Sequence, residues 1–177
     1  DVQGFVASLD ASAAGWAKTA GHAVVLGAGG AARGIVAGLL DRIPGGIIVV
    51  NRTQSRAAEL AAVFGPRVTT QAWADVAAVL PGASLLVNTT SLGMKGQPAL
   101  DIELAPLPVG ALVADIVYVP LETPLLAAAR RRGLQTVDGL GMLLHQAVPG
   151  FARWFGVTPT VTPELRELIV ADIEGHR

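Results

Sequence analysis

Residues 22–33 of the chain read HAVVLGAGGAAR, and this stretch decides the fold. Its first five residues are almost all apolar, which predicts a strand buried on both faces of a sheet. Gly27, Gly29 and Ala32 then follow the spacing GxGxxG/A, with a helical pattern directly behind them. A turn this tight needs glycine torsions, and a pyrophosphate can approach helix amides only where no side chain intervenes. A plain structural turn is the alternative, but the order of strand, turn, helix and second strand favours a nucleotide-binding turn.

Outward from this turn, strand-like and helix-like segments alternate along the chain. The predicted strands are His22 to Leu26, Ile47 to Val50, Val68 to Thr70, Leu85 to Asn88, Leu112 to Ile116 and Gln135 to Val137. The predicted helices are Ala31 to Leu40, Gln54 to Phe64, Ala74 to Leu80, Pro124 to Arg132, Leu140 to Phe155 and Pro163 to Ile173. The alternation predicts an α/β fold with a doubly wound, mostly parallel sheet and extra C-terminal helices. Gly93 to Pro108 shows no period and is predicted to form one long loop.

Composition restricts the classes of function. The 177 residues are 51% hydrophobic and 15% charged, which suits one well-buried domain. A formal net charge of -1 without a long basic run argues against a nucleic-acid partner, and Arg130 to Arg132 are interpreted as a solvated helix end. The absence of cysteine excludes disulfides and thiolate sites. The uncharged window Val76 to Met94 is broken by Pro81-Gly82 and a polar run, so no membrane span is predicted.

The loop after the second predicted strand lacks the acidic residue that commonly binds the ribose of NAD. It contains Asn51, Arg52, Thr53 and, one turn further on, Arg56. A guanidinium binds a phosphate, whereas a carboxylate would repel it, so the loop predicts NADP(H) as the cofactor. The alternative is that Thr53 only caps the next helix and the arginines are solvated.

Six short stretches together resemble one family. They are GAGGAAR and NRTQSR, together with VNTTSLGM (Val87 to Met94), DIVYVPLETPLL (Asp115 to Leu126), DGLGMLLHQA (Asp138 to Ala147) and the opening DVQGF. These stretches resemble the shikimate dehydrogenase (shikimate/quinate dehydrogenase) family, and the resemblance runs over almost the whole chain. It implies a Rossmann-type NADP(H)-binding domain and the reversible reduction of 3-dehydroshikimate to shikimate, a step of chorismate and aromatic amino acid biosynthesis.

The resemblance also implies roles for single residues. Tyr118 and Gln146 match substrate-binding positions, whereas His145 is interpreted as structural because no carboxylate motif lies near it. The implied cofactor-binding residues are Gly27, Ala28, Gly29, Gly30, Ala31, Asn51, Arg52, Thr53, Arg56, Thr89, Thr90, Ser91, Gly93, Met94, Ile116, Val117, Gly139 and Met142. No metal is expected.

The family's catalytic lysine and part of its substrate site precede the region that this chain matches. Asp1 corresponds to the catalytic aspartate paired with that lysine, and neither Lys18 nor Lys95 occupies a catalytic position. We therefore expect the chain to be the C-terminal, NADP-binding portion of the enzyme, beginning at the domain junction, and to be inactive alone. Residues 1–20 are expected to form the junction helix, 21–138 the Rossmann domain and 139–177 helices that return toward a substrate domain, with Leu165, Leu168 and Ile169 as an apolar stripe or simply core.

Other functions stay open on the sequence alone. A quinate/shikimate dehydrogenase of broader specificity shares these motifs, although NAD-preferring quinate enzymes usually carry an acid in the Asn51 loop. Glutamyl-tRNA reductases share a similar nucleotide half but would lack the DGLGMLLHQA signature. A non-catalytic NADP-binding module is the alternative from another class. The expected partners are a small-molecule substrate and, as one option, a second copy in a homodimer, and the expected compartment is the cytoplasm.

Overall fold

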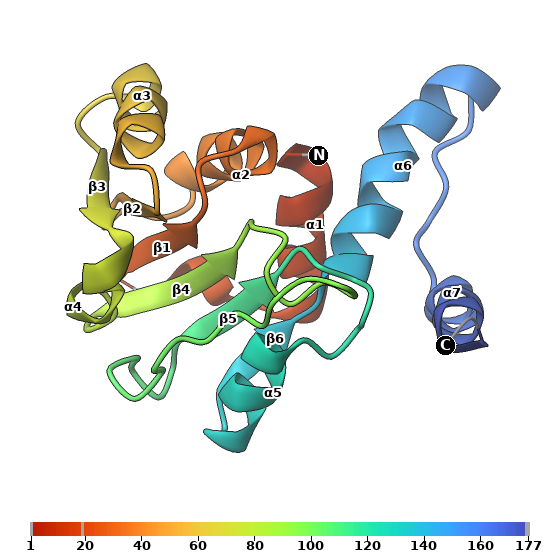
Figure 1. The fold of residues 1–177 in the computed structure, drawn as a ribbon. Coiled ribbons are helices and arrows are strands. Elements are labelled where there is room, and N and C mark those ends of the chain that lie inside the picture. The colour runs from red at the N-terminus through yellow and green to blue at the C-terminus, as the bar shows by residue number, and fades with distance from the viewer. Residues whose placement is uncertain (1, 19, 176–177) are drawn as a thin grey trace.

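The computed structural model describes residues 2–18 and 20–175, and in this part of the chain all strands join one six-stranded sheet. The strands are β1 (His22–Leu26), β2 (Ile47–Asn51), β3 (Val68–Ala72), β4 (Ala83–Asn88), β5 (Leu112–Asp115) and β6 (Gln135–Val137). Every neighbouring pair is parallel, in the order β3-β2-β1-β4-β5-β6 (Figure 1). The predicted doubly wound sheet is confirmed, and its strand order reverses between β1 and β4, where such folds bind ligands.

Helices cover both faces of this sheet. They are α1 (Val2–Ser12), η1 (Trp16–Lys18), α2 (Gly30–Leu40), α3 (Gln54–Phe64), η2 (Trp73–Asp75), α4 (Val76–Val79), α5 (Pro124–Arg131), α6 (Gly139–Phe155) and α7 (Pro163–Gly175). The predicted helix from Ala74 to Leu80 is confirmed in part. Helix α4 lies within it, whereas residues 74 and 75 belong to the 3-10 turn η2 and Leu80 is the C-cap of α4.

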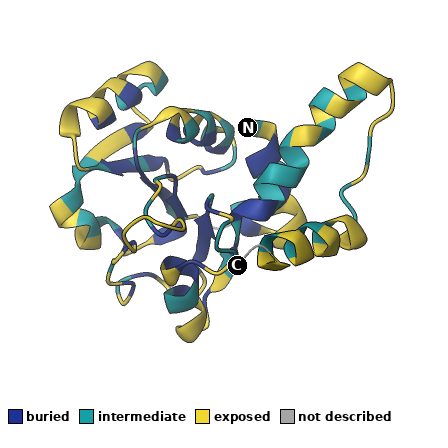
Figure 2. Ribbon diagram, turned by 45° about the vertical axis from the view of Figure 1, so that its right-hand side comes forward, coloured by how far each residue is buried: buried dark blue, intermediate teal, exposed yellow. Residues whose placement is uncertain are grey.

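Alternate strand residues enter two separate cores, as the two-residue period of a strand requires. Val25 and Leu85 join the core beneath α1, α2 and α3, whereas Val24 and Leu86 join the core beneath α4 and α5. The strands are accordingly buried between partly exposed helices (Figure 2). The segment 93–108 is irregular, as predicted, but it buries Leu100, Leu104 and Leu107 in the second core.

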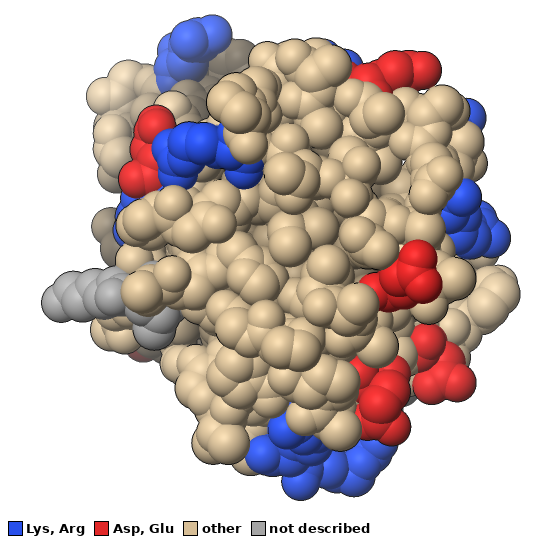
Figure 3. Space-filling view, turned by 90° about the vertical axis from the view of Figure 1, so that its left-hand side faces the viewer, with Lys and Arg blue, Asp and Glu red and all other residues tan. Residues whose placement is uncertain are grey.

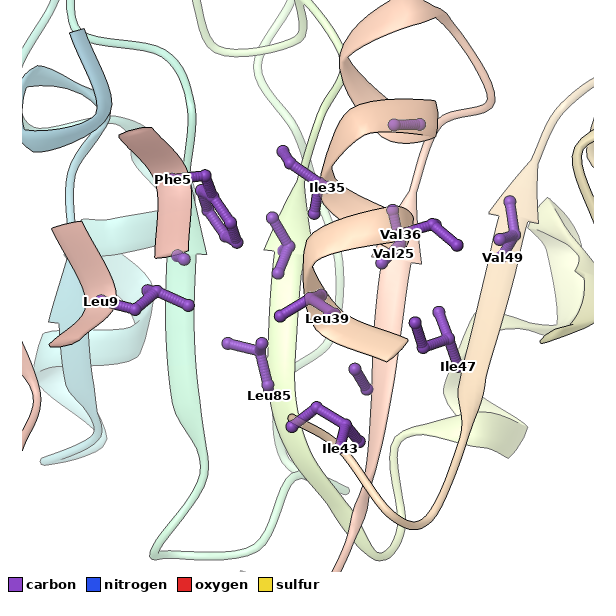
Figure 4. Packing of buried hydrophobic residues seen from close by; sticks show 14 of the residues in the cluster. Phe5, Leu9, Val25, Ile35, Val36, Leu39, Ile43, Ile47, Val49 and Leu85 are labelled. Carbon is purple, nitrogen blue, oxygen red and sulfur yellow. The ribbon is translucent and has the colours of Figure 1, made fainter. Parts of the chain in front are cut away.

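Helix α1 completes the first core beside α2. Phe5 and Leu9 point toward Ile35 and Leu39 of α2 over the strands (Figure 4), and Leu9 is fully buried. At the far end of α1, Asp10 accepts a hydrogen bond of 2.9 Å from the indole of Trp16 and forms an ion pair of 2.5 Å with Arg42. The contacts join α1 to the body of the sheet.

Helix α6 crosses α1 at unusually close range because glycine lies at the crossing. A Cβ on Gly4 would come within 2.7 Å of both the Cβ and the backbone nitrogen of Gln146. Asp138 caps the start of α6 by accepting from the amide of Leu140 at 3.1 Å, and it also pairs with Arg166 of α7 at 2.6 Å. One carboxylate therefore fixes both the beginning of α6 and the position of α7.

Two interpretations of the C-terminal half can be compared with the structure. Arg130 to Arg132 are exposed at the end of α5, as interpreted, and there Arg130 pairs with Glu122 at 2.6 Å and Arg132 donates to the carbonyls of Leu104, Ala105 and Leu107. Of the two alternatives for Leu165 and Leu168, an apolar stripe or core, the structure excludes core, since they are 39% and 67% exposed. They belong to α7, which is largely exposed (Figure 2). Among the described residues, no helix has the length and apolar character needed to cross a membrane.

The crossing of α1 and α6 predicts opposite effects for two glycine substitutions. Gly4→Ala should lower the free energy of unfolding by about 1 to 3 kcal/mol, because the new methyl group would overlap the backbone of Gln146. Gly150→Ala is the control, since no atom lies within 4 Å of the added Cβ in α6, and it should raise stability by about 1 kcal/mol through helix propensity. Urea unfolding of the parent and both variants measures these changes in the free energy of unfolding. Equal changes in the two variants would contradict the close crossing.

Candidate functional site

The glycine turn after β1 opens a surface at the carboxyl end of the sheet. Gly27 has φ +106°, and a Cβ there would come within 2.7 Å of Thr89 Oγ1. Its amide donates to the carbonyl of Val50 at 2.8 Å, which ties the turn to the end of β2. Gly29 precedes α2, and no atom lies within 4 Å of the Cβ position of Gly29 or Gly30. The first amides of α2 are therefore open to an anion.

The loop after β2 borders the same surface. Asn51 donates from Nδ2 to the carbonyl of Thr53 at 2.9 Å, and the side chains of Arg52 and Arg56 are exposed. Thr53 occupies the N-cap position of α3, but its hydroxyl makes no capping hydrogen bond, which weakens the alternative that this residue only caps the helix. No carboxylate occupies the tip of the loop, which leaves it able to accept a phosphate.

A groove of about 390 Å³ joins these two loops to the end of β4. We call it the glycine-turn groove, and its lining residues are Gly27, Ala28, Gly29, Asn51, Arg52, Trp73, Thr89, Thr90, Ser91, Leu92, Gln97 and Pro98. It lies over β1, β2 and β4, across the point where the strand order reverses. The structure thus brings together the glycine turn, the Asn51 loop and the Thr89 loop, which are far apart in the sequence.

A second groove, of about 400 Å³, continues from the first over the end of β5. This β5 groove is lined by Thr89, Thr90, Ser91, Met94, Ile116, Val117, Tyr118 and Val119, so it shares its first three residues with the glycine-turn groove. Tyr118 is 39% exposed at its edge. Beyond it, Met94 and Val119 also border a larger hollow of about 860 Å³ that reaches Ile173 of α7.

Gly139 holds the beginning of α6 against the strand end that forms the β5 groove. Its amide donates to the carbonyl of Val117 at 3.2 Å, and a Cβ at Gly139 would overlap the carbonyl of Ile116. Met142, one turn later, is half-buried and packs against the first core, as Ile116 does. Gln146 is half-buried where α6 crosses α1 and is not among the residues that line the β5 groove.

The remaining residues singled out from the sequence lie at several different places. Gly30 and Arg56 line a separate groove beside the glycine turn, and Gly93 borders the hollow next to α7. Ala31 lies in the first turn of α2, and neither it nor Thr53 is among the residues that line the glycine-turn groove, the β5 groove or the groove beside the turn. Asp1 lies outside the described residues. His145 is half-buried, and burial lowers its pKa.

Asp115 and Asn88 form a buried polar connection between the two strand ends. Asn88 donates from Nδ2 to Asp115 Oδ1 at 2.9 Å, and that oxygen also accepts from the amide of Val117 at 3.0 Å. The other carboxylate oxygen accepts from the hydroxyl of Thr123 at 2.8 Å, and this hydroxyl in turn caps α5. The loop after β4 and the loop after β5 are therefore joined through one carboxylate.

The same asparagine also shapes the loop that the two grooves share. Its Oδ1 accepts from both the amide and the hydroxyl of Thr90, at 3.0 and 2.7 Å, while Nδ2 donates to the carbonyl of Leu92 at 3.1 Å. Thr89 donates its hydroxyl to the carbonyl of Leu26 at 2.6 Å. These threonine hydroxyls thus bond within the protein, and Ser91 keeps an exposed position at the groove.

The sequence did not predict that Asn88, Asp115 and Thr123 bond to one another, although all three lie in motifs of the family. The available signal was a polar residue at the end of each of two apolar strands, because parallel strands end at the same edge of a sheet. Trp73, which lines the glycine-turn groove, and Arg33, which lines the groove beside it, carried no sequence signal of their own.

Burial raises the pKa of Asp115 to about 6, against the opposing effect of the hydrogen bonds from Val117, Thr123 and Asn88. Since the pKa is raised in the folded state, the carboxyl group stabilises the fold most below its unfolded pKa. This contribution is lost as the pH rises from about 4 to about 6. The loss amounts to about 3 kcal/mol, because one pKa unit corresponds to about 1.4 kcal/mol.

The variant Asp115→Asn tests this effect, because an amide keeps the shape of the side chain but does not titrate. Urea unfolding between pH 4 and pH 7 should show the parent losing about 3 kcal/mol relative to Asp115→Asn as the pH rises. Asp101→Asn, at an exposed position, serves as a control and should run parallel to the parent. A constant difference between the parent and Asp115→Asn across this pH range would refute the raised pKa.

Two family models and many known proteins match this chain. A model of the shikimate/quinate 5-dehydrogenase family matches residues 12–94, and a model of the shikimate 5'-dehydrogenase C-terminal domain matches residues 139–162. The shikimate dehydrogenase (NADP(+)) of Rhodopseudomonas palustris strain BisB5 is 63% identical over 99% of this chain and 62% of its own length. That of Nitrobacter hamburgensis is 64% identical over 98% of this chain and 60% of its own length. The chain thus spans about three fifths of these curated relatives.

Solved structures show the same fold. Quinate dehydrogenase from Corynebacterium glutamicum in complex with NAD has a TM-score of 0.86 at 30% identity, over 96% of this chain and 61% of that one. Shikimate 5-dehydrogenase from Thermus thermophilus in complex with NADP(H) and shikimate has a TM-score of 0.79 at 32% identity, over 96% of this chain and 60% of that one. Together with the two matching family models, these relatives show that the chain belongs to the shikimate/quinate dehydrogenase family.

Proposed function

We propose that the chain is the NADP(H)-binding region of a shikimate dehydrogenase, which reversibly reduces 3-dehydroshikimate to shikimate in aromatic amino acid biosynthesis. The observation that carries the proposal is the Asn51-Arg52 loop, which lines one groove together with the glycine turn and lacks a carboxylate at its tip. A ribose that bears a 2′-phosphate suits a guanidinium there, whereas an acidic residue would reject it. Relatives at 63% and 64% identity are named as NADP(+) enzymes, which supports the same cofactor.

The described residues fit NADP(H) along the whole length of the two grooves. The open amides of α2 suit the pyrophosphate, and the Arg52 side suits the adenosine ribose. The apolar β5 groove, with Met94, Ile116 and Val117, suits a nicotinamide ring. When bound, NADPH would supply the hydride for reduction of the ketone. The chain's own task in this proposal is to hold and orient the cofactor beside Tyr118.

The substrate would lie on the Tyr118 side of the β5 groove. Tyr118 at the edge of the β5 groove and Gln146 on α6 are proposed to contact substrate hydroxyls. Asp1 is proposed as the aspartate of the catalytic pair, and no catalytic role is given to Lys18 or Lys95. Residues 1–20 and 139–177 are proposed to flank the cofactor domain (21–138) on the side of the substrate, and the cytoplasm is proposed as the compartment of this biosynthetic step.

A quinate dehydrogenase is the second candidate, because a quinate enzyme with bound NAD shares the fold at a TM-score of 0.86. The Asn51-Arg52 loop argues against NAD as the cofactor of such an enzyme, because it lacks the acidic residue that binds the ribose of NAD. Substrate choice between shikimate and quinate is decided by the residues around the substrate, so both compounds belong in the activity test.

Calorimetric titration tests the cofactor. The chain should bind NADP+ more tightly than NAD+, and Arg52→Asp should weaken NADP+ by about 100-fold or more, since a favourable charge is replaced by a repulsive one. The affinity for NAD+ should change little in Arg52→Asp, because NAD+ has no 2′-phosphate. Equal losses for both nucleotides would remove Arg52 from contact with the 2′-phosphate, and an equal affinity of the parent for both would contradict the NADP(H) proposal.

The reaction is tested by following the absorbance of the NADPH that forms when shikimate is oxidised by NADP+. With shikimate and NADP+, the 177-residue chain alone is expected to show no turnover, whereas a chimera carrying the N-terminal two fifths of the Rhodopseudomonas palustris relative should oxidise shikimate. A chimera that binds NADP+ tightly but oxidises neither shikimate nor quinate would support a non-catalytic module instead. Turnover by the chain alone would show that it contains the proton chemistry.

A further inference from the structure

A third groove lies between α2 and α3, directly beside the proposed cofactor site. This α2–α3 groove has a volume of about 290 Å³ and is lined by Ala28, Gly29, Gly30, Arg33, Arg56, Glu59 and Leu60. It shares Ala28 and Gly29 with the glycine-turn groove, so the two hollows meet at the turn itself. Helices α2 and α3 lie next to each other on one face of the sheet (Figure 1).

Two arginines line this groove from different helices. Arg33 belongs to α2 and Arg56 to α3, and both side chains are exposed. Among the described residues, neither guanidinium has a hydrogen-bond or ion-pair partner, whereas Arg42, Arg130 and Arg166 all pair with carboxylates. Arg33 and Arg56 are therefore available to an external anion.

The start of α2, which also lines the α2–α3 groove, favours an anion there as well. Gly29 and Gly30 leave open space above the first amides of α2, where the helix dipole is positive. Glu59 is the one acidic residue among those that line the groove, and it disfavours a phosphate there. On the face seen in Figure 3, the described residues form no broad basic patch, because their charged side chains lie in small separate groups of both signs. The two arginines are a local feature, which suits one small phosphate group.

The position of the groove indicates which phosphate it takes. It lies on the α3 side of the glycine turn, beside the loop that follows β2, and that loop faces the adenosine ribose in folds of this kind. The pyrophosphate of a bound dinucleotide belongs over the turn itself. A phosphate on the ribose 2′-oxygen would extend toward α3, between the walls that carry the two arginines.

We propose that Arg33 is a specificity-determining residue, which binds the 2′-phosphate of NADP(H) from the α2 wall while Arg56 binds it from the α3 wall. This inference rests on the proposed function and adds Arg33 to the residues assigned to the cofactor. Arg33 can donate two parallel hydrogen bonds to phosphate oxygens, and NAD(H) has no group for it to contact.

The test measures the affinities of four probes by calorimetry: NADP+, NAD+, 2′-AMP and 5′-AMP. Arg33→Met should weaken NADP+ and 2′-AMP by about 10-fold, the loss expected for one charge-assisted hydrogen-bonded contact, and should change NAD+ and 5′-AMP by less than about 2-fold. Arg33→Lys should recover part of the affinity. Glu59→Gln should tighten NADP+, because it removes the carboxylate from the same groove.

Arg131→Met is the matched control, since Arg131 is an exposed arginine in the last turn of α5, away from the residues that line the α2–α3 groove. It should leave all four affinities unchanged. Equal weakening of NADP+ and NAD+ by Arg33→Met would overturn the proposal and assign Arg33 to the pyrophosphate, and no change in either would overturn it outright. A parent chain that does not prefer NADP+ to NAD+ would instead refute the proposed function.

Discussion

The structure depends on the close approach of the glycine turn to the end of β4. Gly27 takes a backbone conformation that residues with a side chain rarely adopt, and it leaves no space for a Cβ beside Thr89. β1 lies between β2 and β4, so a shift at this turn would move both neighbours. The turn also sets where α2 begins, and α2 provides both the open amides and one wall of the groove that contains Arg33.

A second constraint lies on the other side of the sheet's switch point. The loops after β4 and β5 border a common groove, and each is irregular, so neither could keep its shape by regular hydrogen bonding. Asp115 and Asn88 supply the missing bonds from within, and their burial makes each unsatisfied bond costly. A rigid sheet and a buried polar connection thus hold two loops that would otherwise be mobile.

Much of this architecture was predictable because it follows from local patterns. Continuous apolar strands, glycine spacing and helix periodicity predicted the parallel sheet, the turn and the order of the elements. Strand β3 extends two residues beyond its predicted end at Thr70 because its pairing with β2 continues to Ala72, and a pairing partner cannot be read from a single segment. The hydrogen bonds of Arg132 could not be predicted for a related reason, since the carbonyls that it contacts belong to the long loop before β5.

The sequence by itself determined the fold class, the family and the residue types offered to a phosphate, because each depends on motifs within a few residues of one another. Only the tertiary structure decided which of these motifs meet. Asn88 and Asp115 are joined because parallel strands end at one edge of the sheet, and Arg33 lies across from Arg56 because α2 and α3 pack on one face. The exposure of Leu165 and Leu168 was likewise decided by where Asp138 holds Arg166, a contact between residues that no local pattern connects.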